Sequence, residues 1–108
     1  MAFDVITPVK LGQASITVAV ANLYTVPADT RTFIKSIDIA NTTSAAVRVT
    51  VYVGDGAAAA NTLIPNVSIP AYSVMAWRGA QILNATDTIQ TEAAAVGCTI
   101  TASGGEAV

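Results

Sequence analysis

Apolar and polar residues alternate with a period of two along most of the chain. The clearest case is residues 47–53, where four valines point to one side and Arg48, Thr50 and Tyr52 point to the other. Such alternation predicts a β-strand that buries one face and exposes the other. Five further runs alternate in this way: Ile16-Thr17-Val18-Ala19-Val20, Phe33–Ile39, Tyr72–Arg78, Asp87–Ala94 and Cys98–Ser103.

Within these runs the pattern predicts which residues face the core. Phe33, Ile37 and Ile39 should share one face, with Lys35 as the one polar intruder. The other predicted inward sets are Ile16, Val18 and Val20; Met75 and Trp77; Ile89, Thr91 and Ala93; and Cys98, Ile100 and Ala102. Val, Ile and Thr are plentiful, and β-branched side chains fit a pleated, half-buried surface.

Turn-forming residues separate the predicted strands. They are Pro27-Ala28-Asp29, Asn41–Ser44, Gly54-Asp55-Gly56, Pro65-Asn66, Pro70 and Asn84–Asp87. Because of its flanking prolines, Val67–Ile69 is predicted to be a short edge strand. The chain thus carries seven to nine short antiparallel strands and no helical stripe. We expect an all-β fold, a single β-sandwich with either jelly-roll or Greek-key, immunoglobulin-like, connectivity.

Residues 1–108 suffice for one domain. We expect residues 1–9 to form an N-terminal arm outside the sandwich, and Gly104-Gly105 to release residues 104–108 as a C-terminal tail. No apolar stretch is long enough for a membrane-spanning helix. The N-terminal residues do not resemble a secretory signal, and Cys98 is the only cysteine, so we expect synthesis in a reducing cytoplasm.

Composition adds that the surface is smooth and poor in charge. Charged residues make up 11% of the chain, against about 25% in ordinary soluble domains. The net charge is −2, and the mean hydropathy of +0.58 comes largely from Ala and Val. No basic stripe is offered to nucleic acid or to an anionic membrane. Small uncharged side chains favour burial against neighbouring subunits.

The residues offer little chemistry. The chain has no histidine, which excludes Ser–His and Cys–His nucleophile pairs and removes the commonest zinc ligand. Cys98 is expected to be a core thiol. Gly54–Asn61 lacks the lysine and the spacing of a phosphate-binding loop. We therefore expect no enzyme activity, cofactor, metal or small-molecule substrate, although a calcium ion shared between subunits stays open.

Three side chains are candidate subunit contacts. Arg48 and Tyr52 share the outer face of one predicted strand, and Arg78 follows Trp77 in another. Trp and Arg are enriched at binding hot spots. Trp77 itself is expected to be a core aromatic, since it shares a face with Met75. Carbohydrate binding is a weaker alternative, because sugar sites usually expose several aromatic rings and this chain has only six aromatic residues.

Several segments resemble small β-sandwich accessory proteins of tailed-bacteriophage virions. They are Leu23–Ala28, Ile34–Thr42, Val49–Gly54 and Ile82–Ile89. The likeness spans roughly residues 23–103 and rests on turn-and-strand patterns, which unrelated sandwiches can approach by convergence. The resemblance implies a structural role on a capsid or tail, many copies per particle and no catalytic residues to transfer.

The expected function follows from these points. The chain is predicted to be a capsid decoration (cement) protein that binds over joints of the major capsid protein and stabilises the head. It would contact the capsid protein and copies of itself, as a dimer or trimer, on the capsid surface of a virion assembled in a bacterial cytoplasm. The alternatives are a tail, fibre or baseplate component, and a carbohydrate-binding β-sandwich module.

Overall fold

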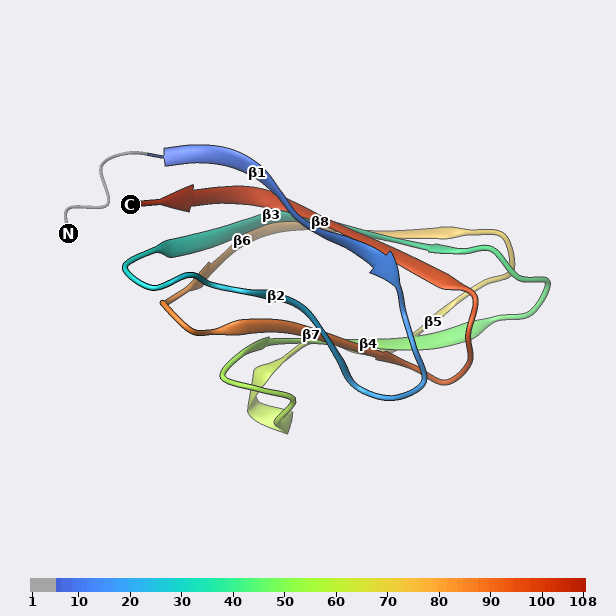
Figure 1. Cartoon of the computed structure of the whole chain (residues 1–108). Helices are drawn as coiled ribbons and strands as arrows, with labels where there is room; N and C mark the ends of the chain where they lie inside the picture. Colours follow the sequence, from blue (N-terminus) through green and yellow to red (C-terminus); the bar gives the residue numbers. More distant parts are fainter. Residues whose placement is uncertain (1–5) are drawn as a thin grey trace.

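A computed structural model describes residues 6–108, and it is all-β (Figure 1). Eight strands follow one another, with one short 3₁₀ turn, η1 (Ala59–Asn61), before the fifth. The strands are β1 (Ile6–Ser15), β2 (Ala21–Thr25), β3 (Arg31–Asn41), β4 (Val47–Gly54), β5 (Thr62–Ile69), β6 (Val74–Leu83), β7 (Thr88–Ala93) and β8 (Cys98–Ala107). They form two antiparallel four-stranded sheets, in the orders β1-β8-β3-β6 and β2-β7-β4-β5.

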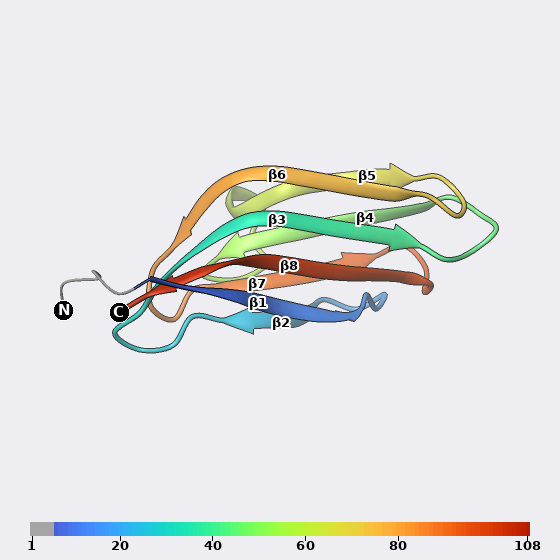
Figure 2. The same ribbon diagram turned by 90° about the horizontal axis from the view of Figure 1, so that it is seen from above.

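The two sheets face one another in a β-sandwich-like arrangement, seen from above in Figure 2. Their inner faces meet in an aliphatic core, so the predicted fold class is confirmed at this level. The strictly alternating strand β4 supplies Val47, Val49 and Val51 to this core, while Val53 is half-buried at its margin. The inward sets predicted for β7 and β8 are also buried.

Strand β3 departs from the predicted face. Thr32 and Ile34 point inward, the register then shifts between Ile34 and Ser36, and Ile37 resumes the inward alternation. A β-bulge adds one residue to the strand, so the buried residues are even-numbered before the bulge and odd-numbered after it. Phe33 was predicted to face the core with Ile37 and Ile39, and this was wrong, because Phe33 lies on the outer face of β3. Lys35 is an exposed residue at the bulge and does not intrude into the core.

Residues 16–20 form a loop, so the strand predicted there was wrong. Ile16 is buried, but Val18 and Val20 are exposed. The chain crosses here from β1 in one sheet to β2 in the other. A segment that changes sheets leaves the hydrogen-bonding plane of both, and alternation alone does not reveal such a crossing.

Residues 6–9 and 104–107, predicted to lie outside the sandwich, belong to one of its sheets. Residues 104–107 continue β8, which pairs with β1 on one side and β3 on the other, so the predicted C-terminal tail was wrong. Residues 6–9 pair with 104–107 as the start of β1, which corrects that part of the predicted arm. Residues 1–5 lie outside the described part of the chain. Glycine at 104 is needed because β3 passes so close.

The predictions for the two edge strands β5 and β6 are partly confirmed. Val67–Ile69 does lie in an edge strand, although β5 begins earlier, at Thr62. Met75 and Trp77 share the inner face of β6, as predicted, but both are half-buried at the rim of the core. The Trp77 ring lies over Gly79, because a Cβ there would be 3.0 Å from its Cζ2 atom. Trp77 is a rim residue, not the centre of the core.

Candidate interaction surfaces

Arg48 and Tyr52 lie where the alternation placed them, on the outer face of the β2-β7-β4-β5 sheet. Beside them is a shallow hollow of about 180 Å³. It is lined by Arg48, Thr50, Asn66, Glu92, Ala93 and Ala94. The hollow therefore spans three neighbouring strands, β5, β4 and β7.

An irregularity in β5 forms one wall of the hollow. The pairing with β4 shifts around Pro65 and Asn66, and Asn66 has a positive φ of 46°. The Asn66 backbone N–H donates to the Thr50 hydroxyl at 3.2 Å, and the Arg48 guanidinium donates to the Asn66 carbonyl at 3.1 Å. Asparagine tolerates this left-handed conformation well. Two side chains of β4 thus hold the bulge in place.

Glu92, which sequence reasoning did not single out, completes the hollow. It lies on β7 directly across from Thr50 and accepts a hydrogen bond from the Tyr52 hydroxyl. This hydrogen bond, with some burial, raises the pKa of Tyr52, so the phenol stays protonated. The hollow therefore presents a cation, a carboxylate and a hydroxyl, which suit hydrogen bonding to a polar partner. Only the strand order, which alternation does not give, brings Glu92 to Tyr52.

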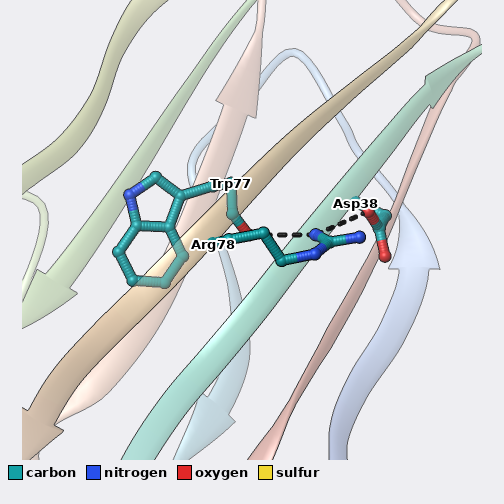
Figure 3. A network of polar contacts seen from close by, with 3 residues as sticks. All are labelled: Asp38, Trp77 and Arg78. Atoms are coloured by element: carbon teal, nitrogen blue, oxygen red, sulfur yellow. Dashed lines mark hydrogen bonds and ion pairs between the residues drawn. The ribbon is translucent and has the colours of Figure 1, made fainter.

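Arg78 lies on the other sheet, so the structure does not bring the three candidate contacts together. It is exposed on β6 and forms an ion pair with Asp38 of β3 at 2.9 Å (Figure 3). The guanidinium also donates to the Trp77 carbonyl at 3.1 Å, while the indole ring lies on the opposite side of the strand. An exposed pair of this kind contributes little to stability. It does hold Arg78 close to the sheet.

A third surface lies at one end of the sandwich. We call it the four-loop end, and it comprises residues 16–20, 42–46, 70–73 and 94–97, the loops that follow β1, β3, β5 and β7 (Figures 1 and 2). Backbone hydrogen bonds connect these loops in series. They run from Ala93 N–H to Thr17 O, from Thr42 N–H to Gly97 O and from Tyr72 N–H to Thr43 O, at 3.0–3.1 Å.

Asn41 is the polar centre of this end. Its side-chain amide donates to the carbonyls of Ala45, Ile69 and Pro70, at 2.8, 2.9 and 3.2 Å. Its side-chain oxygen accepts from the Thr43 backbone N–H and hydroxyl. Asn41 itself is buried, and every polar group of its amide has a partner. Networks satisfied in this way make a surface rigid.

The four-loop end carries no charge and exposes several large apolar side chains. Its exposed large side chains are Tyr72 at 74%, Val96 at 69%, Val18 at 56% and Val20 at 44%, joined by Val74 at the start of β6. None of the four loops contains Lys, Arg, Asp or Glu. At the opposite end, each of the loops 26–30, 55–61 and 84–87 contains one Asp and no cation. The molecule is therefore polarised, with an uncharged end and an acidic end.

Tyr24 joins the two sheets near the acidic end. Its hydroxyl donates to Glu106 of β8 and lies 2.7 Å from the buried Thr32 hydroxyl of β3. Burial, reinforced by the hydrogen bond to Glu106, raises the pKa of Tyr24 to about 12. The neutral phenol thus belongs to the folded state.

We expect stability to fall at alkaline pH because of this phenol. The folded pKa lies above the ordinary tyrosine pKa of 10.0, so the stabilisation is complete below pH 10 and is lost as pH rises through about 12. Tyr24→Phe should cost about 1 kcal/mol at neutral pH, a value reduced for solvent screening. It should also flatten the decline above pH 10 in urea unfolding. An unchanged alkaline profile would contradict this, and the exposed Tyr72→Phe is the matched control.

Among residues 6–108, no three His, Cys, Asp or Glu side chains gather as a metal site would require. Cys98 is buried, and burial raises the pKa of its thiol. No helix in the described part of the chain is long and apolar enough to cross a membrane. The described surfaces suit binding to other molecules: the four-loop end exposes apolar side chains, and the hollow beside Arg48 exposes polar groups.

Comparison with protein families, curated proteins and solved structures finds no match to this chain.

Proposed function

We propose that this chain is a structural subunit of a tailed-bacteriophage virion, most specifically a capsid decoration protein that stabilises the head. The observation that carries the proposal is the four-loop end. A rigid, uncharged surface with exposed apolar side chains gains free energy when another protein surface covers it. Such a surface matches the building-block role that the sequence resemblance implies.

The strand order supports a jelly-roll connectivity within this proposal. β1 pairs with β8, β2 with β7, β3 with β6 and β4 with β5. This nested pairing is what a long antiparallel hairpin produces when it wraps into two sheets of four. Jelly rolls have eight strands in two Greek keys and occur in viral capsid proteins and lectins. An immunoglobulin-like connectivity would pair the strands in another order.

The mechanism would be contact area repeated over a shell. Specific protein interfaces bury about 1,600 Å² in total. Many modest contacts on one particle add by avidity, so a subunit need not bind tightly alone. A surface without charges loses little free energy by desolvation when it is covered. The acidic end would then point away from the capsid, which disfavours aggregation of particles.

The test compares particles with and without this protein. Particles that lack this protein should lose infectivity and release their genome at a lower temperature than complete particles. Adding the purified protein should restore their heat resistance. Tyr72→Asn should restore much less. Tyr72 has a positive φ of 54°, which suits Asn, so this variant removes the exposed ring without straining the fold.

The matched control is Thr86→Asn, an exposed residue with φ 72° at the acidic end. This variant should restore the heat resistance of the particles as well as the wild-type protein does. Equal heat resistance of particles with and without the protein would contradict the proposal. A tail or baseplate position would use the same surfaces, and a few copies per particle would distinguish it from a decoration protein.

The polar hollow supports a second candidate function, carbohydrate binding. Carboxylate, guanidinium and hydroxyl groups lie together there, with Tyr52 beside them. Glu92→Gln should abolish binding on a glycan array if the hollow is a sugar site. Absence of any glycan signal from the wild type would leave the structural role as the proposal.

A further inference from the structure

Within residues 6–108, two strands of each sheet have a free edge, and such edges need protection. A free edge exposes unpaired backbone N–H and C=O groups that another strand can bind. Here the edges are β1 and β6 in one sheet and β2 and β5 in the other. Natural proteins protect edges with proline, lysine, bulges or short strands.

Three of the four edges carry these features. β1 contains Pro8 and Lys10 and has a register shift after Lys10. β2 has only five residues and contacts β1 across the sandwich. β5 contains Pro65 within its register shift. None of these strands offers a long regular edge.

β6 is the exception. It has ten residues and no proline, and Arg78 is its one charged residue. Its pairing with β3 is continuous from Val74 to Arg78 and shifts only beyond Arg78. Residues 74–78 therefore present a regular, unprotected edge to an incoming strand.

The side chains along this edge are incompletely buried. Met75 and Trp77 face the core but are only partly buried. Val74 and Ala76 are exposed on the outer face, and Val74 is 65% accessible. A strand added beside β6 would cover Met75 and Trp77 and complete the core at this side.

We propose that this strand is β6 of a second copy, paired antiparallel about a two-fold axis at Ala76. The two β1-β8-β3-β6 sheets would then form one continuous eight-stranded sheet. This inference rests on the proposed function, because it supplies the self-association that a repeating structural subunit uses. It also specifies a dimer with a defined register.

The register follows from the side chains. With Ala76 opposite Ala76, Met75 of each copy lies across from Trp77 of the other, and sulfur–aromatic contacts are favourable. Val74 lies across from Arg78, so the two arginines are not opposed and each keeps its Asp38 partner. Centring the pair on Arg78 would instead place like charges together. Isologous contacts of this kind close as a dimer.

Disulfide trapping tests the register. Ala76→Cys should form a covalent dimer under mild oxidation, because the Cα atoms of directly opposed antiparallel residues are about 4.5–5.5 Å apart, a separation that a disulfide can span. Val74→Cys and Arg78→Cys should each form no covalent dimer alone and should cross-link to each other when mixed. Ala80→Cys, an exposed residue of the same strand beyond the register shift, is the control and should not cross-link. Cross-linking of Ala80→Cys as readily as Ala76→Cys would overturn the proposal.

Sedimentation of the full chain provides the second readout. The wild type should be a dimer, and Ala76→Lys should weaken the dimer at least about tenfold, because two lysines would oppose each other. Ala80→Lys should sediment as the wild type does. A wild-type monomer, a trimer, or a dimer that Ala76→Lys leaves intact would overturn the proposal. Particles that still need this protein for heat resistance would then show that only the dimer, and not the structural role, is wrong.

Discussion

Replacing Gly104 with alanine is expected to destabilise the chain by about 3 kcal/mol or more. Gly104 lies in the central strand β8, between Val9 of β1 and Ile34 of β3. A Cβ at this position would overlap the Phe33 carbonyl oxygen and lie 2.9 Å from its carbonyl carbon. These are backbone atoms of a paired strand, so they cannot move aside without breaking the β3–β8 ladder.

Thermal unfolding measures this effect. For a domain of this size the melting temperature should fall by roughly 10–20 °C. The neighbouring Ser103→Ala substitution is the control and should change stability by less than about 0.5 kcal/mol. A Gly104→Ala protein that melts within two or three degrees of the wild type would contradict the structure of β8 given above.

Asn41→Ala should have the second-largest effect, a loss of about 3 kcal/mol. The substitution removes three donated and two accepted hydrogen bonds and leaves the Ile69 carbonyl, bonded to Asn41 in the buried interior, without this donor. Leaving a buried carbonyl without a hydrogen-bond donor costs more free energy than an average hydrogen bond contributes to stability. The loops 42–46 and 70–73 should also exchange their amide hydrogens faster, since the Asn41 side chain connects these two loops of the four-loop end.

Asn41→Asp separates the donors from the acceptor. Aspartate keeps the oxygen that accepts from Thr43 but has no N–H to donate, so it should be nearly as unstable as alanine in urea unfolding. Asn22→Ala is the control, because Asn22 makes a single exposed hydrogen bond to Thr25. If Asn41→Asp unfolded at the wild-type urea concentration, the three donated bonds would not be what holds the loops.

The sequence predicted the fold class because alternation reports which face a strand buries. It worked best in β4, where four valines alternate without interruption. It failed at Phe33 because one added residue at a bulge reverses the parity, and a bulge leaves no mark in composition. It failed at Val18 and Val20 because the chain changes sheets there, which depends on packing between strands far apart in sequence.

The surfaces were predictable to a smaller extent. Alternation alone placed Arg48 and Tyr52 on one outer face, since both belong to one strand. It could not show that Glu92 lies beside Tyr52 or that Arg78 belongs to the other sheet, because both facts depend on strand order. The uncharged end needed the connectivity too. Its four loops are separated in the sequence, and each is unremarkable until the fold brings them together.

The function proposed for this chain is to cover other protein surfaces on a virus particle. Electron cryomicroscopy of the intact particle tests it most directly, because the density shows how many copies are present and which surfaces they bury. We expect many symmetric copies on the head, with the apolar loops against the capsid and β6 strands paired between neighbours. Wild-type particles whose heads and tails carry no copy of this chain would contradict the account.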